Sequence, residues 1–291
     1  MTSPGNRVLV VGSLHYDIML DAPHLPATGE TVTGHRWYPK FGGKGGNQAV
    51  AAARHGCETC MLGAVGGDGF APFLLEHLER AGVSREFIDI REDSASGMSV
   101  AISDEKGDYG AVIVSGVNLE IDPRKLDDAG LWENTAILLL QNEVTDSLNL
   151  AAARRARGEG VQVCLNAAPA RPLDEALEQL VDILVVNALE ARELCGEPIH
   201  DLASANRAAG RLAGRFPVAV VTAGADGVAV ASAEHGSFSL PAEPVDLVST
   251  HGAGDVFTGT LCAALASGCG LENAVTAANE SAARHVSAKA L

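Results

Sequence analysis

The chain lacks an excess of positive charge: its 291 residues contain 21 Lys and Arg against 37 Asp and Glu, which gives a net charge of −16. A negative surface repels nucleic acid and anionic lipid, so the composition argues against both as partners. No apolar run approaches the roughly 20 residues of a membrane span, and residues 1–12 lack the features of a signal peptide. We therefore expect a cytoplasmic protein that binds neither nucleic acid nor membranes.

Cysteine is scarce and has no disulfide-framework spacing. The six cysteines lie in apolar segments, which is typical of small buried hydrophobic side chains. Cys57 and Cys60 have the spacing of redox and zinc pairs, but no second pair and no nearby His pair supplies the four ligands that tetrahedral zinc needs. No metal or redox role is predicted for them.

Short apolar runs alternate with longer segments of helical period. Runs rich in β-branched residues predict buried strands at 7–11, 61–65, 136–140, 161–165, 183–186 and 218–222. Helical spacing predicts helices at 47–55, 70–81, 148–157, 188–195, 204–213, 255–267 and 271–286. This alternation indicates right-handed βαβ units, and hence a three-layer α/β/α fold with a mostly parallel central sheet.

Two stretches, at about 17–41 and 96–114, interrupt this alternation and are typical of hairpins. The first contains several Pro and Gly residues and an alternating segment at 31–33. The second pairs residues 97–103 with 109–114 across a turn at 104–108. Together they predict a small β-sheet that forms a lid on a single domain of residues 1–291.

A glycine turn near the C-terminus, Gly252-Ala253-Gly254-Asp255, precedes an apolar helix. Gly252 and Gly254 allow several N–H groups to point into one concavity, and the helix adds the positive end of its dipole. We therefore expect an anion at this turn. Asp255 is either an ordinary acidic residue of a first helical turn or a base held beside a bound phosphate.

A second glycine cluster, Gly42-Gly43-Lys44-Gly45-Gly46-Asn47-Gln48, precedes an alanine-rich helix. It is not a Walker A loop, because Gly45 follows Lys44 where Ser or Thr is required. Gln48 stands where a dinucleotide fingerprint has its third glycine, which argues against a dinucleotide-dependent oxidoreductase. We interpret the cluster as a hinge where the backbone approaches a ligand; the alternative is a purely structural tight turn.

Polar residues follow the predicted strands: Glu143, Asn166, Asn187, and Thr222 with Gly224. Ligands of open parallel sheets bind outside the carboxyl ends of the strands, so these positions together indicate a binding site. Each alone is more often a helix cap, and Asn187 is well placed to be one. Asp17, which follows the first strand, is either a bidentate acceptor for two hydroxyls of a polyol or a solvated loop acid.

Over nearly its whole length the chain resembles ribokinase-type members of the PfkB carbohydrate kinase family. Gly42-Gly43-Lys44-Gly45-Gly46-Asn47 matches the family's N-terminal signature, and Thr250-His251-Gly252-Ala253-Gly254-Asp255 matches its C-terminal signature. Asn166-Ala167-Ala168-Pro169-Ala170 is similar to the Asn-Pro-Ala-Pro-Ala segment of ribokinases. The resemblance implies a ribokinase-like fold and ATP-dependent phosphorylation of a primary hydroxyl of a small sugar.

The resemblance also implies roles for single residues. Asp255 would be the catalytic base, and the amides of Gly252, Ala253, Gly254 and Asp255 would form an anion hole. Positions that match sugar contacts are His15, Asp17, Gly43, Lys44, Asn47 and Glu143. Positions that match nucleotide contacts are Asn187, Thr222, Gly224, Gly227 and Asn279, the last near the adenine. Glu190 would organise Mg²⁺ through water, together with Asn187.

The chain departs from the family's pattern at three places. His15 and Tyr16 stand where ribokinases usually carry Asn and a small residue, which predicts a bulkier pocket and argues against ribose itself. Ser249 replaces the acid that helps to bind a monovalent cation, and Leu291 ends the chain before the loop that completes that site. Potassium activation is therefore not expected, unless the tail is incomplete. The segment from Asn187 to Glu190 keeps the outer pair of the Asn-Glu-Thr-Glu element but lacks its inner acid.

Two alternatives to a sugar kinase stay open. A nucleoside kinase of the same family is one, because Tyr16 and Met98 near the pocket could face a base. A sugar- or nucleotide-binding protein without turnover is the other, since the fold does not determine the function. For association, an exposed apolar face of the lid predicts a homodimer formed through the lid, as the family resemblance also implies.

Overall fold

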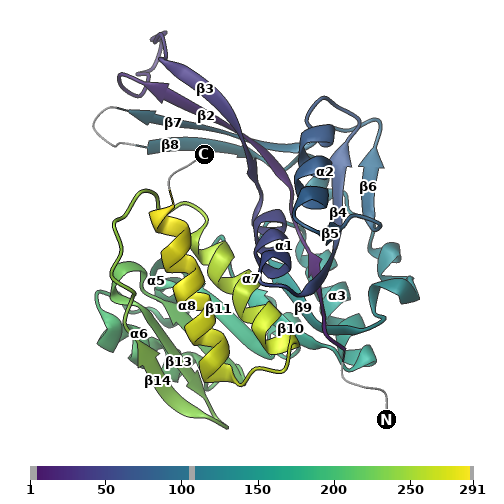
Figure 1. Cartoon of the computed structure of the whole chain (residues 1–291), viewed down its shortest axis with the longest axis vertical. Coiled ribbons are helices and arrows are strands. Elements are labelled where there is room, and N and C mark those ends of the chain that lie inside the picture. Colours follow the sequence, from purple (N-terminus) through teal and green to yellow (C-terminus); the bar gives the residue numbers. More distant parts are fainter. Residues whose placement is uncertain (1–4, 105–108, 289–291) are drawn as a thin grey trace.

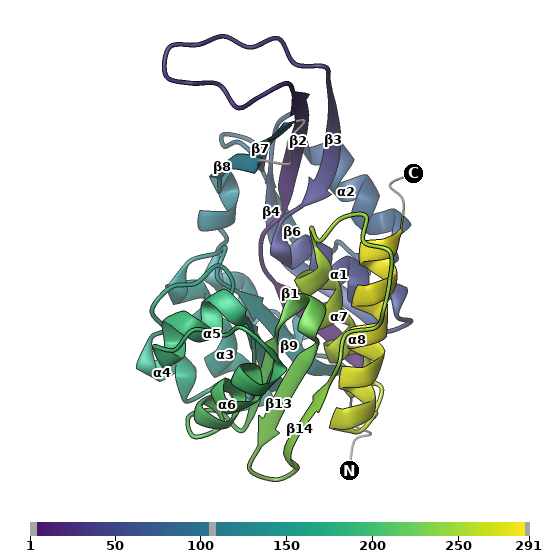
Figure 2. The same cartoon turned by 90° about the vertical axis from the view of Figure 1, so that its left-hand side faces the viewer.

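The computed structural model describes residues 5–104 and 109–288 (Figure 1). In this part of the chain, ten strands form one large sheet that is covered by helices on both faces (Figures 1 and 2). Four further strands form a small second sheet that projects beyond the body. The predicted three-layer α/β/α arrangement with a small additional sheet is therefore confirmed.

The large sheet is parallel from β12 to β5 and ends in two antiparallel strands. Its strands, in sheet order, are β14 (Gly236–Leu240), β13 (Val228–Ser232), β12 (Val218–Thr222), β11 (Ile183–Asn187), β10 (Gln162–Asn166), β9 (Thr135–Gln141), β1 (Arg7–Val11), β4 (Glu58–Gly66) and β5 (Val83–Ser84). The strand β6 (Ile88–Arg91) pairs with β4. All six predicted strands are present, whereas β5, β6, β13 and β14 were not predicted.

Helices on the two faces of the large sheet close two separate cores. One face carries α1 (Lys44–Arg54), α2 (Ala71–Arg80), α7 (Ala253–Ala266) and α8 (Leu271–Ser287). The other carries α3 (Asp146–Glu159), α4 (Glu175–Glu178), α5 (Ala188–Cys195) and α6 (Leu202–Leu212). Short 3-10 turns are η1 (Gly116–Leu119), η2 (Pro123–Asp127), η3 (Ala129–Leu131) and η4 (Gly224–Asp226).

Strand β1 shows why the predicted strands are apolar at consecutive positions. Val8 and Val10 pack into the core beneath α1 and α7, whereas Leu9 and Val11 pack into the core beneath α3. Because successive side chains of a strand point to opposite faces, a strand covered on both sides needs apolar residues at every position. The unbroken apolar runs of the sequence therefore mark the centre of the sheet.

The small sheet, which we call the lid sheet, forms from both segments that interrupt the alternation. Its order is β3 (Arg36–Gly42), β2 (His15–Ala22), β7 (Gly97–Asp104) and β8 (Tyr109–Val114). Residues 31–33, expected to alternate within the first hairpin, lie instead in the long connection between β2 and β3 (Figure 2). Of the turn predicted at 104–108, residues 105–108 lie outside the described residues.

The cysteines follow the expectation of burial at four positions. Cys57, Cys60, Cys164 and Cys262 are buried, Cys195 is half-buried and Cys269 is exposed. Burial raises the pKa of the Cys60 thiol to about 11, so this thiol is protonated at neutral pH, and the thiolate is the reactive and metal-binding form. Within residues 5–104 and 109–288, no helix is long and apolar enough to cross a membrane.

Candidate active site

A cavity of about 140 Å³ lies at the carboxyl edge of the large sheet, where β10, β11 and β12 end. The lid sheet rises from the same edge, because β2 begins only a few residues after β1 ends (Figure 2). The residues that line the cavity are Lys44, Asn166, Ala168, Val185, Val186, Asn187, Glu190, Thr222, Gly252, Gly254, Asp255 and Thr258. Both glycine motifs and three of the strand-end polar residues therefore meet in one place.

The C-terminal glycine turn forms the start of α7. Gly252 is the N-cap residue and has a φ of 82°, a left-handed conformation that favours glycine. In the described part of the chain, no side chain caps this helix. The N–H groups of its first turn therefore stay available to a ligand, and the helix dipole makes that position favourable for an anion.

Asp255 lies in the first turn of α7 and is only 7% exposed. Its Oδ2 accepts a hydrogen bond from Asn47 Nδ2 at 3.2 Å, and its Oδ1 accepts one from Gln48 Nε2 at 3.0 Å. Burial raises the pKa of Asp255, while the nearby Lys44 ammonium and the bond from Gln48 oppose that effect. A fixed carboxylate with a raised pKa at a helix N-terminus is a suitable proton acceptor.

Gln48 joins three segments that are distant in sequence. Besides Asp255, its Nε2 reaches Oδ1 of Asn166 at the end of β10, at 2.9 Å. Gln48 and Asn166 are both buried. One amide of α1 thus fixes the carboxylate of α7 relative to the sheet.

Lys44 and Glu143 bring α1 to the loop after β9. Glu143 Oε2 accepts hydrogen bonds from Ser13 Oγ at 2.5 Å and from the backbone N–H of Lys44 at 2.8 Å. Burial lowers the pKa of the Lys44 ammonium, but the carboxylates of Asp255, Glu143 and Glu190 outweigh burial, so the pKa is raised. Lys44 is therefore charged at neutral pH and faces the cavity.

The N-terminal glycine cluster provides close packing within the protein. Helix α1 begins at Lys44, three residues earlier than predicted, so Gly45 and Gly46 are helical. A Cβ on Gly45 would lie 2.6 Å from the backbone N of Ser13, and one on Gly43 would lie 2.8 Å from the backbone of the same β1–β2 turn. These contacts agree with the structural alternative for the cluster and bring α1 directly against the start of the lid sheet.

Close approach of α1 and α7 depends on another glycine. A Cβ on Gly259 would lie 2.3 Å from the backbone O of Gln48 and 2.8 Å from Cβ of Ala51. Any larger residue would push α7 away from α1. Asp255 and Gln48 can bond only while these helices touch.

Asp17 and His15 lie on β2, beside the cavity rather than in it. Asp17 is buried and accepts a hydrogen bond from Ser99 Oγ at 2.5 Å. Burial raises the pKa of Asp17, and the bond from Ser99 opposes this. His15 Nε2 is buried with no hydrogen-bond partner in the described chain, and its Nδ1 lies 4.0 Å from Glu143 Oε2. A buried imidazole ring with one unpartnered nitrogen suits a polar ligand.

Asn187 is a helix cap, as its position suggested. Its side chain accepts from the backbone N–H groups of Leu189 and Glu190 at the start of α5. Glu190 in turn accepts from the backbone and side-chain N–H groups of Asn187, at 2.8 and 2.9 Å. Burial raises the pKa of Glu190, and these hydrogen bonds oppose it. The pair thus caps a helix and presents a fixed carboxylate to the cavity.

Of the other positions predicted to contact the nucleotide, only one lines the cavity. Thr222 lines it at the end of β12, whereas Gly224, Gly227 and Asn279 do not. Gly227 packs against the end of β14, where a Cβ would be 2.1 Å from Leu240 O. Asn279, on α8, is occupied by a hydrogen bond to Pro241 O at 2.9 Å.

A model of the pfkB family carbohydrate kinases matches residues 6–290. The chain belongs to this family. It is therefore a carbohydrate kinase, as both glycine signatures predicted.

Similar proteins agree with this assignment. The kinase is 37% identical to the ribokinase of Mus musculus over 263 residues, which cover 89% of this chain and 81% of that protein. It is 33% identical to the ribokinase of Bacillus subtilis (strain 168) over 282 residues, covering 96% and 92%. The structure of Arabidopsis thaliana ribokinase complexed with ribose and ATP has a TM-score of 0.90 at 27% identity, covering 98% and 94%.

Four residues of the kinase site were missed or undervalued by sequence reasoning. Gln48 was noted only because it breaks a dinucleotide fingerprint, and Ser13, Ser99 and Thr258 were not singled out. Thr258 lines the cavity, and its Oγ1 donates to Gly254 O at 2.8 Å. Its spacing of four residues from Gly254 along α7 was the available signal.

Proposed function

We propose that this kinase transfers the γ-phosphate of ATP to the hydroxymethyl group of a small sugar of the pentose class, with Asp255 as the base. The observation that supports this most is the buried Asp255 carboxylate, held by Asn47 and Gln48 at the uncapped start of α7. His15 and Tyr16 argued against ribose from the sequence, but relatives named ribokinase are 37% and 33% identical, so ribose is now the first candidate.

The acceptor sugar would lie between the lid sheet and α1. Asp17 is placed to accept hydrogen bonds from sugar hydroxyls, and charge makes such bonds strong. Asn47, whose side-chain amide donates a hydrogen bond to Asp255, would lie between the acceptor and that carboxylate. His15 offers a free ring nitrogen, which an Asn at that position would replace with an amide. This difference gives the pocket its own hydrogen-bond pattern.

In the proposed reaction, the hydroxyl oxygen of the sugar attacks the γ-phosphorus while Asp255 accepts the proton of that hydroxyl. The bond from that phosphorus to the β,γ-bridging oxygen breaks, and ADP leaves with the electron pair. The N–H groups of the glycine turn and the Lys44 ammonium face the charge that develops on the transferred group. The chain supplies positioning and charge, which are the main requirements of phosphoryl transfer.

Mg²⁺ is implied by the kinase activity. No group of three or more His, Cys, Asp or Glu side chains in the described residues could hold a metal. This fits Mg²⁺, which keeps several waters and takes most other ligands from substrate phosphates. Glu190, fixed by Asn187 at the cavity wall, would hold the ion through water. When bound, Mg²⁺ would neutralise phosphate charge.

Tyr16 argues against a nucleoside as acceptor. Its ring stacks on Phe70 with centroids 4.2 Å apart and meets Phe73 edge-on at 5.0 Å. An aromatic ring packed in this way joins the lid sheet to α2 and leaves less surface for a base. The large side chain of Tyr16 thus packs against the protein itself.

A substrate panel tests the proposal. We expect ADP release in a coupled assay with ATP and Mg²⁺, with kcat/KM at least about tenfold higher for ribose or deoxyribose than for hexoses or nucleosides. A preference for nucleosides would overturn the acceptor class. Tight sugar binding without ADP release from any compound would instead indicate a binding protein.

We also infer that the kinase forms a homodimer through the lid sheet. Both edge strands of this sheet expose apolar side chains: Trp37, Tyr38, Val112, Ile113 and Val114. Unpaired edges and apolar patches of this kind favour association with a second copy. Light scattering after size exclusion is expected to give twice the mass of one chain, and a monomer at micromolar concentration would contradict the inference.

A further inference from the structure

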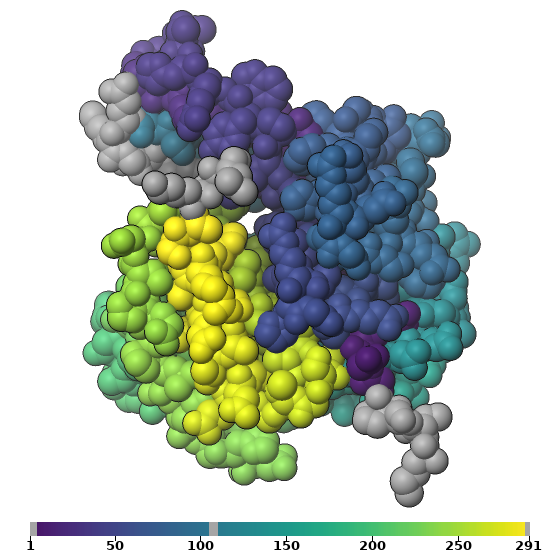
Figure 3. All heavy atoms as spheres, viewed as in Figure 1, coloured from purple at the N-terminus to yellow at the C-terminus, as the bar shows by residue number. Residues whose placement is uncertain are grey.

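A second, larger cavity of about 560 Å³ lies on the outer side of α1, bounded by α7, α8 and strand β3 of the lid sheet. Figure 3 shows the molecular surface hollowed between α8 (yellow), α1 (violet-blue) and the lid sheet above them. Cationic and titratable basic side chains line it: Lys40, Arg54, Arg284, His55, His77, His251 and His285. None of the described residues lining it is Asp or Glu, although the chain has a net charge of −16.

The cations of this cavity are poorly neutralised by the protein. Among the described residues, neither Lys40 nor Arg54 forms an ion pair, although Asp17, opposite Lys40 on the neighbouring strand, partly offsets the charge of that lysine. Arg284 has Glu280 at 3.5 Å, but both side chains are largely exposed, and exposed pairs are weak. The positive charge is therefore available to a ligand.

Burial and nearby cations lower the pKa values of two histidines in this cavity. Burial and the nearby Arg54 and Arg80 lower the pKa of His77. Burial and Lys40 lower the pKa of His251, against the opposing effect of Asp17. A bound anion would act in the opposite direction on both rings.

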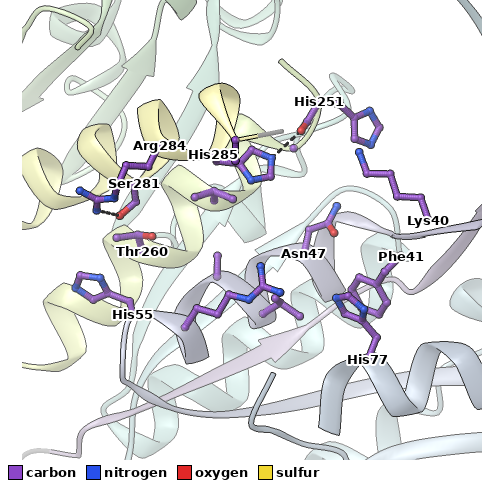
Figure 4. A pocket seen from close by; sticks show the side chains of 16 residues that line it. Lys40, Phe41, Asn47, His55, His77, His251, Thr260, Ser281, Arg284 and His285 are labelled. Atoms are coloured by element: carbon purple, nitrogen blue, oxygen red, sulfur yellow. Dashed lines mark hydrogen bonds between the residues drawn. The ribbon is translucent and has the colours of Figure 1, made fainter. Parts of the chain in front are cut away.

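Hydrogen-bond donors surround the same space. In Figure 4, Lys40 extends toward His251, and Asn47 points into the cavity from α1. His285 Nε2 donates to the backbone O of His251 at 2.9 Å, which ties α8 to the glycine turn. Guanidinium groups and ring nitrogens at such a site match the several acceptor oxygens of a phosphate.

The cavity touches the site of phosphoryl transfer at two residues. Asn47 lines it and also donates to Asp255 Oδ2 at 3.2 Å. Gly252 lines both cavities. A ligand that contacts Asn47 or the glycine turn from this side changes groups that the acceptor also meets.

We propose that this cavity is an anion site for a small phosphorylated metabolite, and that its occupancy is linked to the acceptor site through Asn47 and the glycine turn. The link rests on the proposed function, whereas binding of the anion does not. Because linkage is reciprocal, the sugar and the anion must change each other's affinity by the same factor.

Calorimetric titration with pyrophosphate tests the site, with a saturating non-hydrolysable ATP analogue present so that the nucleotide site is filled. The Arg54→Gln/Arg284→Gln variant should bind pyrophosphate at least about tenfold more weakly, since each lost charge-assisted bond is of that order. Both arginines are exposed, so the fold should persist, as a thermal melt would verify. The matched control is Arg124→Gln/Arg192→Gln, which removes equal charge from exposed residues elsewhere.

We expect the control variant to bind within about twofold of wild type. Equal weakening in both double variants, or no binding by wild type, would overturn the site. For the link, the Kd of the sugar should change at least about threefold with saturating pyrophosphate in wild type but not in the Arg54→Gln/Arg284→Gln variant. An unchanged sugar Kd would overturn the link alone. Both measurements are independent of ADP release, so a failure of the proposed reaction is distinguishable.

Discussion

Asp255→Asn is expected to lower kcat at least about 10²-fold, on the scale of losing a general base. The amide keeps the size and can keep hydrogen bonds with Asn47 and Gln48, but it cannot take a proton. A coupled ADP-release assay measures the effect, and Asp127→Asn, an exposed carboxylate of η2, is the matched control. A turnover near that of wild type would remove Asp255 from the role of base.

The same variant should be at least as stable as wild type at pH 7. Burial raises the folded-state pKa of Asp255 above its ordinary value of 3.8. The stability that this group contributes is therefore fully present below pH 3.8, and it is lost as the pH rises through the folded-state pKa. At pH 7 the buried charge opposes folding, and a neutral Asn does not carry it. A marked fall in Tm would show that Asp255 supports the fold, and the kcat loss could then not be assigned to chemistry.

Gly45→Ala is expected to destabilise the kinase by about 1–3 kcal/mol, which is typical of overpacking. The new Cβ would meet the backbone of Gly12 and Ser13 at 2.6–2.8 Å, and backbone atoms cannot move aside singly. This cost opposes the roughly 1 kcal/mol that Ala ordinarily gains over Gly in a helix. Since Ser13 also bonds Glu143, sugar affinity should fall as well.

Gly210→Ala is the matched control because the expected sign is opposite. Gly210 is an exposed helical glycine of α6, and a Cβ at this position would have no described atom beyond its own helix turn within 4 Å. Urea unfolding should show a gain of about 0.5–1 kcal/mol for this variant. If Gly45→Ala unfolded at the same urea concentration as wild type, the glycine cluster would not be needed for close packing.

Much of the fold could be predicted because burial on both faces leaves a local mark in the sequence. The central strands contain runs of consecutive apolar residues, as at residues 8–11 of β1, and this pattern needs no knowledge of partners. The edge strand β14 lacked such a signal, since it is half polar and largely exposed, whereas β13 is buried with four consecutive apolar residues and was missed despite that signal. Strands β5 and β6 are only two and four residues long, too short for a period to appear.

The candidate site could be predicted where its residues lie close together in short sequence motifs. The glycine turn with Asp255 indicated an anion site from its residues alone. The bonds from Ser99 to Asp17 and from Gln48 to Asn166 were not predictable, because they join residues 82 and 118 positions apart. Such contacts can be recognised only when the positions of the lid sheet and the large sheet in space are known.

The contact between Gln48 and Asp255 joins residues 207 positions apart. During synthesis the N-terminal part of a chain leaves the ribosome first, whereas a domain generally folds as a unit. The lid sheet and α1 therefore leave the ribosome long before the carboxylate that α7 brings to them. Because the proposed base comes last, we expect an unfinished chain to show no turnover of ATP until its last two helices dock.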